Sequence, residues 1–220
     1  MTRVLHAAEE LLPALGAEPV PDGAVLVEGD RVLDLGPLER LREANPTARV
    51  RSWAGLLLPG LTHPHTGPLL EAAYHPDPRE YAALGDQPLT GPALDALAPD
   101  DTRWGGSARR GLQRLLRHGV TEVTGPFHRP PVQVAVRRSG LRSRPPSYAA
   151  PSDAGPVLDP LALAPLDEVL LGRLAPGAPA DLTVLALTAR DLAETRLGGG
   201  TDRPECRATV VGGRLLYRGR

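Results

Sequence analysis

The sequence predicts a mixed α/β fold in which both chain ends join in one β-rich subdomain and the middle forms an α/β insertion. Residues 23–36 (GAVLVEGDRVLDLG) contain two β-rich runs around a Gly-Asp pair, which is typical of a β-hairpin because glycine supplies the positive φ of the turn. Residues 208–219 (ATVVGGRLLYRG) show the same pattern around a Gly-Gly pair. Between the two hairpins, a helix over 100–119 leads directly into a strand over 120–125.

Proline and glycine mark the element boundaries between the first hairpin and the middle of the chain. Residues 36–46 predict a short helix that begins near Pro37 and ends at Pro46. Residues 48–61 predict extended structure. Residues 71–99 are rich in proline, glycine and aspartate, and they predict a long irregular segment with one helical turn. Long irregular segments inside a domain are often functional.

The helix predicted over 100–119 has the clearest amphipathic pattern. Asp100 or Asp101 can cap its start, and Gly119 ends it. Apolar residues at spacings of three or four form one stripe along it: Trp104, Ala108, Leu112 and Leu115. Residues 129–140 favour a second helix, because two prolines suit its first turn and a glycine suits its end.

The last third of the chain predicts a linker followed by a return to β structure. Residues 141–170 are rich in proline and alanine and predict a linker, most clearly over 141–156. Residues 178–187 predict a strand, and residues 188–196 predict a short helix capped by Thr188.

The composition excludes several classes of function. Of the 220 residues, 41% are hydrophobic and 23% are charged, which is enough for a buried core. All 25 basic residues are arginine and the formal net charge is -1, so we expect no nucleic-acid partner. The single cysteine, Cys206, can form neither an intrachain disulfide nor a cysteine-based zinc site. No signal-peptide core and no apolar run of about 18 residues is present, so we expect a cytoplasmic protein without membrane association.

Two histidines on alternate positions follow a Pro-Gly pair in residues 56–70 (LLLPGLTHPHTGPLL). Alternate residues of a strand point to the same side, so His63 and His65 could bind one metal ion. Pro64 between them indicates an edge strand or an irregular backbone. Stable zinc binding usually needs three or four protein ligands. His75 would be the third ligand if its HPDP segment folds back over the strand end.

Four segments together resemble the amidohydrolase superfamily, and most closely its imidazolonepropionase-like branch. DGAVLVEGDRVLDLGP resembles the N-terminal hairpin of this family, and WAGLLLPGLTHPHTGP resembles the junction where the first barrel strand presents a metal-binding His-x-His. LQRLLRHGVTEV resembles the following helix and strand, and GRLAPGAPADLTVL with ATVVGGRLLYRG resembles a returning β-sandwich. The resemblance implies a small β-sandwich built from both chain ends, a (β/α)8 barrel with divalent metal, and hydrolysis of non-peptide C–N bonds by a metal-activated water.

The chain departs from the family pattern in its length and in its histidine motif. A closed barrel takes about 200 to 250 residues, whereas residues 56–170 number 115, and no histidine follows His128. The family pattern is Pro-Gly, two apolar residues and Asp-x-His-x-His. Aligned from the Pro-Gly pair, the aspartate falls on His63, the first histidine on His65 and the second on Gly67. We therefore expect a truncated barrel and a degenerate metal motif.

Two interpretations of the site remain open at this point. If the site is active, His63, His65 and His75 bind zinc or another divalent metal, and Asp77 or Glu71 acts as the base. If it is inactive, no cofactor is expected and the histidines mark a solvent-exposed, formerly catalytic strand end.

Other titratable residues are expected to have structural or surface roles. His118 suits a helix C-terminus, where a cation is favoured by the helix dipole. His128 is expected at the surface, and Cys206 is expected as a small residue near the start of a strand. The resemblance implies that Asp181 has a structural role in the sandwich, where it caps the turn into a strand.

We expect residues 1–55 and 171–220 to form a β-sandwich-like composite subdomain, residues 56–140 a truncated barrel remnant (strand, loop, helix, strand, helix), and residues 141–170 a linker. The favoured function is that of a non-catalytic imidazolonepropionase-like homologue with a binding, scaffolding or regulatory role. The alternatives are a minimal metal-dependent hydrolase of a small cyclic amide or amidine, and a decaying gene product. An open remnant would expose strand edges and apolar faces, which predicts a homodimer or a protein partner that covers them.

Overall fold

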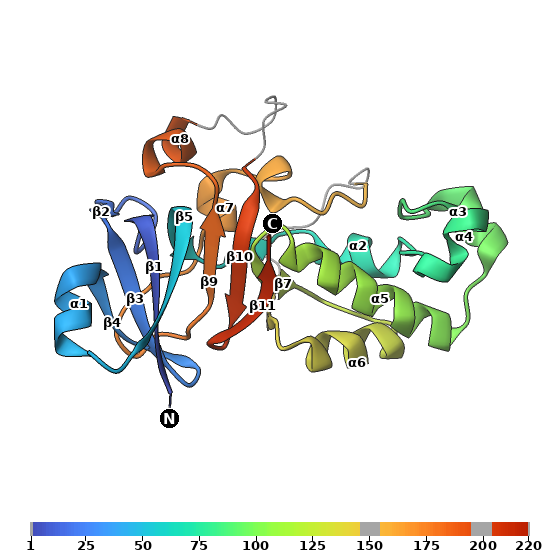
Figure 1. The fold of residues 1–220 in the computed structure, drawn as a ribbon. Coiled ribbons are helices and arrows are strands. Elements are labelled where there is room, and N and C mark those ends of the chain that lie inside the picture. The colour runs from blue at the N-terminus through green and yellow to red at the C-terminus, as the bar shows by residue number, and fades with distance from the viewer. Residues whose placement is uncertain (1, 146–154, 195–203, 220) are drawn as a thin grey trace.

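The computed structural model describes residues 2–145, 155–194 and 204–219, and it has a mixed α/β fold (Figure 1). The described strands form two sheets, one of eight strands and one of three. The larger sheet occupies one side of the molecule in Figure 1, and the longest helices, α5 (Asp101–Leu116) and α6 (Pro130–Ser139), lie on the other. The mixed α/β class predicted from the sequence is confirmed.

The larger sheet joins the two ends of the chain. Its order is β11 (Arg214–Arg218), β10 (Cys206–Val211), β9 (Leu182–Leu185), β5 (Arg49–Pro59), β1 (Arg3–Leu11), β3 (Gly23–Glu28) and β4 (Arg31–Pro37), with β2 (Val20–Pro21) paired to β1. β1 and β5 are parallel, and the other pairs are antiparallel. The two predicted hairpins are β3–β4 and β10–β11. The sequence did not predict β1, although this strand lies between β5 and β3.

The larger sheet curves so that its two hairpins meet. Val27 of β3 shares an apolar cluster with Val184 of β9 and Val210 of β10, although β1 and β5 separate these strands in the sheet order. The turn between β3 and β4 also touches the turn between β10 and β11, because a β-carbon on Gly213 would collide with the Gly29 carbonyl oxygen. The first and last hairpins therefore pack against each other.

The smaller sheet has three parallel strands in the order β6 (Leu61–His63), β7 (Val120–Thr124) and β8 (Arg142–Arg144). Helix α5 precedes β7 and helix α6 follows it, as predicted. Both helices pack with Val120 and Val123 of β7 in one apolar cluster. The Asp100 carboxylate caps α5 by accepting a hydrogen bond from the Arg103 amide at 2.8 Å. β6 and β8 are the edges of this sheet.

The predicted irregular segment contains more helix than its composition indicates. Helix α2 (Thr66–Glu71) lies just before this segment. Within the segment are the 3-10 helix η1 (Pro78–Glu80), α3 (Tyr81–Leu84) and α4 (Gly91–Leu97). Proline lies in the first turn of both η1 and α4. Two of the prolines that predicted irregular structure, Pro78 and Pro92, therefore start helices, where proline is tolerated.

Two other short helices are close to their predicted places. They are α1 (Leu38–Ala44) and α8 (Ala189–Glu194). Thr188 caps α8, since its hydroxyl accepts a hydrogen bond from the Asp191 amide at 3.1 Å. The last two residues of the helix predicted over 188–196, residues 195 and 196, lie outside the described residues.

Residues 141–170 differ from the predicted linker, although residues 146–154 of it lie outside the described residues. Besides β8, this segment forms η2 (Pro160–Ala162) and α7 (Leu166–Val169). Both elements contact β6, an edge of the smaller sheet. Leu161 and Val169 are buried with Leu61 of β6 in one apolar cluster. The composition of the segment could not show that its leucines and valine have this edge to pack against.

Replacing Gly213 by alanine should lower the free energy of unfolding more than replacing Gly177 by alanine. Both glycines have left-handed backbones, with φ of +72° and +84°, so each substitution costs about 1 kcal/mol in backbone strain. Only at Gly213 would the new methyl group meet a backbone oxygen, whereas nothing lies within 4 Å of a β-carbon at Gly177. Urea unfolding measures both losses. Equal losses would contradict the contact between the two turns.

Candidate functional site

The two histidines of the Pro-Gly segment lie at the end of β6 and at the start of α2. Gly60 allows β6 to begin close to β7, because a β-carbon on Gly60 would overlap the Thr121 side chain. His63 ends β6 and is fully buried. His65 is the N-cap residue of α2 and is also buried. Neither ring is the solvent-exposed strand end that an inactive site was expected to leave.

The His63 ring is held by polar groups of its own chain. Its Nε2 atom lies 2.9 Å from the Val157 carbonyl oxygen, and its Nδ1 atom lies 3.3 Å from the Thr66 hydroxyl. A carbonyl only accepts, so Nε2 carries the proton and donates it to Val157. Burial lowers the pKa of His63 to about 4, against the effect of the Val157 bond and with smaller contributions from the charges of His65 and His118.

His75 packs against α5. Its Nε2 atom lies 3.1 Å from the Leu69 carbonyl, and its amide donates to the Ser107 hydroxyl at 2.8 Å. The ring occupies the space beside Gly111, where a β-carbon would lie 2.8 Å from Nε2. Burial lowers the pKa of His75 to about 4, against the effect of the Leu69 bond.

This geometry does not fit the three-histidine metal site considered from the sequence. Across residues 2–145, 155–194 and 204–219, no group of three His, Cys, Asp or Glu side chains could hold a metal ion. His63 and His75 each direct a ring nitrogen at a backbone carbonyl. Burial lowers the pKa of His65, and the nearby charge of Glu168 opposes this. His63 and His65 lie close enough for their charges to interact. His75 packs against α5.

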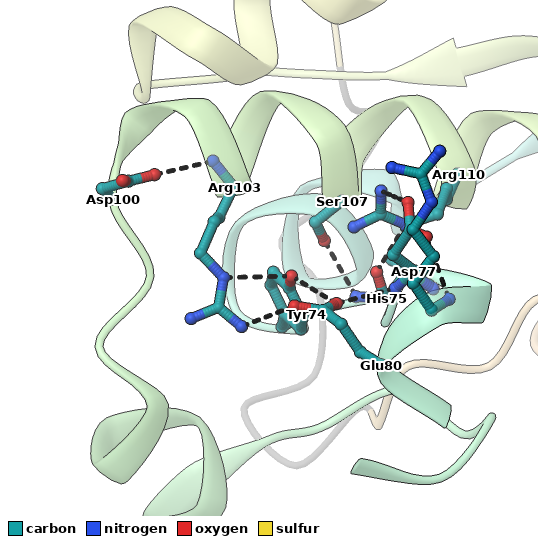
Figure 2. A network of polar contacts seen from close by, with 9 residues as sticks. Tyr74, His75, Asp77, Glu80, Asp100, Arg103, Ser107 and Arg110 are labelled. Carbon is teal, nitrogen blue, oxygen red and sulfur yellow. Dashed lines mark hydrogen bonds and ion pairs between the residues drawn. The ribbon is translucent and has the colours of Figure 1, made fainter. Parts of the chain in front are cut away.

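Asp77 belongs to a polar network that fastens residues 74–80 to α5 (Figure 2). Arg110 of α5 donates to the His75 carbonyl at 2.8 Å and forms an ion pair with Asp77 at 3.2 Å. The Asp77 carboxylate also accepts a hydrogen bond from the Arg79 amide at 3.0 Å, at the start of η1. This candidate base therefore has two structural partners.

Tyr74 and Glu80 complete the network (Figure 2). The Tyr74 hydroxyl donates to Glu80 at 2.8 Å, and Arg103 forms an ion pair with the same carboxylate at 2.7 Å. The guanidinium carbons of Arg103 and Arg110 lie 5.2 and 5.8 Å from the centroid of the buried Tyr74 ring. Cations over an aromatic face are attracted to its negative charge. The segment that the sequence marked as a functional loop is thus docked on α5.

Glu71, the other candidate base, binds the start of α6. Its Oε1 atom accepts hydrogen bonds from the His128 and Arg129 amides at 2.6 and 2.7 Å. Amides at a helix N-terminus lack partners within the helix, so a carboxylate there is stabilising. Glu71 therefore has a capping role in this structure.

A polar pocket that sequence reasoning missed lies where the two sheets meet. It has a volume of about 210 Å³. Glu122 of β7 accepts a hydrogen bond from the Thr62 hydroxyl at 2.9 Å and forms an ion pair with Arg142 at 3.3 Å. Arg142 also reaches Asp181 at 3.6 Å. Thr62, Glu122 and Arg142 are register partners on adjacent strands, so their side chains share one face of the sheet.

This polar face differs from the apolar face expected of an open remnant. Helices α5 and α6 pack with Val123, so the alternate orientation of Glu122 places it on the opposite face of β7. In a complete (β/α) barrel, the face opposite the helices points to the packed interior. Here that face carries an ion-pair network. A glutamate in the middle of the VTEVT strand was the one signal of this in the sequence.

Asp181 lines the pocket and also binds a turn distant in the chain, rather than the turn into its own strand that the resemblance implied. Its carboxylate accepts a hydrogen bond from the Gly212 amide at 2.8 Å, in the turn between β10 and β11. Burial raises the pKa of Asp181, against the effects of the Gly212 bond and the Arg142 charge.

Cys206 and His128 lie where the sequence placed them. Cys206 begins β10 and is buried, and burial raises the pKa of its thiol to about 11. The thiol is therefore protonated at neutral pH, which removes its nucleophilicity. His128 is exposed.

Comparisons with known proteins point to the resemblance found in the sequence. Residues 23–48 match the family model of the imidazolonepropionase-like composite domain of bacteria, which confirms the resemblance over that hairpin and helix. A search of curated protein sequences gives no significant match.

Several solved structures are similar to parts of the fold. An ochratoxinase from A. niger is 19% identical with a TM-score of 0.42, over 66% of this chain and 30% of that protein. A guanine deaminase from E. coli is 18% identical with a TM-score of 0.47, over 65% of this chain and 35% of that protein. An adenosine deaminase from Xanthomonas campestris with bound zinc is 17% identical with a TM-score of 0.44, over 69% of this chain and 37% of that protein. The chain matches about a third of the length of these proteins.

Within the described residues, no helix has both the length and the apolar character needed to cross a bilayer.

Acidification from pH 7 to pH 4 should lower the free energy of unfolding, because buried histidines resist protonation. His6 of β1 is buried and stacks on Trp53 with ring centroids 6.3 Å apart. Burial, and then the charge of Arg51, lower the pKa of His6 to about 4. An unfolded chain has a histidine pKa of about 6.5. Between pH 6.5 and pH 4 the unfolded chain therefore binds more protons than the folded protein. The free energy of unfolding consequently decreases as the pH falls through this range.

The effect of one such shift is about 3 kcal/mol, and His63 and His75 act in the same direction. A His6→Gln variant should lose part of the pH dependence in urea unfolding, whereas His128→Gln at an exposed position should keep it. A stability that is constant between pH 7 and pH 4 would contradict the buried neutral state of these histidines.

Proposed function

We propose that the chain is a non-catalytic homologue of the imidazolonepropionase-like amidohydrolases, with a binding, scaffolding or regulatory role. One observation carries the proposal: each candidate catalytic or metal-binding group for which the structure gives partners is bound to groups of its own chain. His63 is bound to Val157, His75 to Leu69, Asp77 to Arg110, and Glu71 to the start of α6.

The chemistry of metal-dependent hydrolysis supports this proposal. A catalytic zinc site needs three protein ligands, an open position for water and a base near that water. His63 could become a ligand through Nε2 only by leaving the Val157 carbonyl, and His75 through Nε2 only by leaving the Leu69 carbonyl. Asp77 would have to leave its ion pair with Arg110 to act as a base. Each change costs a buried or partly buried polar contact.

The domain organisation is part of the same proposal. We assign residues 1–55 and 171–220 to a β-sandwich-like composite subdomain, which the curvature of the larger sheet supports. We assign residues 56–140 to a barrel remnant. Residues 155–170 then lie against the β6 edge, where a closed barrel would pair its last strand. The chain itself thus packs residues against β6, one of the two edge strands of the smaller sheet that a partner was expected to cover.

A homodimer or another protein partner remains part of the proposal, and so does a cytoplasmic location. The β8 edge of the smaller sheet is the edge that η2 and α7 leave uncovered. It carries Arg142 and Arg144, and charged side chains on an edge strand oppose pairing with another sheet. The buried, reduced Cys206 suits a reducing compartment.

The proposal predicts that the protein holds far less than one equivalent of metal. Protein without a His tag, incubated with Zn²⁺ and dialysed, should show this by elemental analysis, and a His65→Ala variant should give the same value. The expected reason is that His63 and His75 keep their backbone partners.

His128→Ala, at an exposed position, is the matched control for an incidental surface site. A near-stoichiometric content of zinc, iron or manganese that is lost in His65→Ala but kept in His128→Ala would overturn the proposal. It would favour the alternative, a minimal hydrolase of a small cyclic amide or amidine.

A further inference from the structure

A groove with an apolar floor lies between α5, α6 and the edge strand β11. Its volume is about 340 Å³. The apolar residues that line it are Leu112 and Leu116 of α5, Ala135 of α6, Leu141 after α6, and Leu216 of β11. Leu216 is 41% exposed, although it is a large apolar side chain. None of the candidate site histidines lines the groove, so it is distinct from the candidate site.

The rim of the groove is positively charged and unpaired. Arg109 of α5 and Arg138 of α6 line it and are exposed. Over the part of the chain that the structure describes, neither arginine forms an ion pair, and no aspartate or glutamate lines the groove. Arg103 and Arg110, on the same helix α5, do pair with carboxylates of the docked 74–80 segment. The two rim arginines are therefore available to an external carboxylate.

We propose that this groove, which we call the α5–α6–β11 groove, binds an amphipathic segment of a partner protein that carries leucine-like side chains flanked by carboxylates. The apolar floor would take the apolar side chain, and Arg109 and Arg138 would pair with the carboxylates on either side. Protein interfaces combine an apolar core with a polar rim, and arginine is enriched in them. The inference deepens the proposed binding role and rests on it, because it assigns that role a surface.

Charge complementarity favours an acidic partner over a second copy of this chain. A two-fold dimer through the groove would bring Arg109 and Arg138 of one copy toward the same residues of the other. Like charges facing each other across an interface are costly. Pairing two β11 strands around Leu216 would likewise set Arg214 opposite Arg218.

A pair of synthetic peptides tests the proposal on the full-length protein. One peptide of about 14 residues has leucine at every third or fourth position and glutamate between, which suits a helix-in-groove contact. The other has lysine in place of every glutamate. The glutamate peptide should bind at low salt, measured by calorimetry, and the lysine peptide should not. Arg138→Glu should weaken binding of the glutamate peptide about tenfold or more, because it reverses the charge of the rim.

Arg137→Glu is the matched control, because Arg137 is an exposed neighbour on α6 that does not line the groove. Leu216→Ser tests the apolar floor and should also weaken binding. Failure of the glutamate peptide to bind, equal binding of both peptides, or equal loss in Arg137→Glu and Arg138→Glu would each overturn the groove proposal. The metal content tests the proposed function separately, so metal-free protein without peptide binding overturns the groove alone.

Discussion

The hydrogen bond between the His63 ring and the Val157 carbonyl joins two parts of the chain that are 94 positions apart. It connects the end of β6 to the segment that returns from the smaller sheet to the larger one. That segment goes on to form η2 and α7 against β6, with Leu161 and Val169 buried beside Leu61. The same contact thus places this segment beside β6 and engages the Nε2 atom of His63, a candidate metal ligand.

Arginine side chains of α5 also join segments that are distant in the chain. Arg103 and Arg110 project from α5 and hold Tyr74, Asp77 and Glu80, which fixes the proline-rich segment on the helix. Arginine also lies over both tryptophans, since Arg129 is placed over Trp104 and Arg218 over Trp53. On the opposite face of β7, Arg142 binds Glu122 and Asp181 and links the smaller sheet to the turn between β10 and β11. The arginine-rich composition contributes to structure at each of these places.

The elements with strong local signals were predictable, and those that depend on distant partners were not. Hairpins with glycine turns and the amphipathic helix α5 follow from local backbone preferences and periodicity. β1 was missed because its two adjacent glutamates break the apolar pattern, whereas pairing with β5, β3 and β2 stabilises it as a strand. β8 and α7 were missed because they are short and are supported by distant partners, β7 for the strand and β6 for the helix. In the site, the sequence identified His63, His65 and His75. It could not show that Nε2 of His63 and Nε2 of His75 would lie within hydrogen-bond distance of the Val157 and Leu69 carbonyls.

The state of the His63 ring tests the central claim most directly. Long-range proton–nitrogen NMR spectra at pH 6 report the protonation of each ring nitrogen and respond to metal. The structure predicts a neutral His63 with the proton on Nε2, and no change in its ring nitrogens when one equivalent of Zn²⁺ is added. A charged His63 at pH 6, or nitrogen shifts of His63, His65 and His75 that move together on addition of Zn²⁺, would contradict the account.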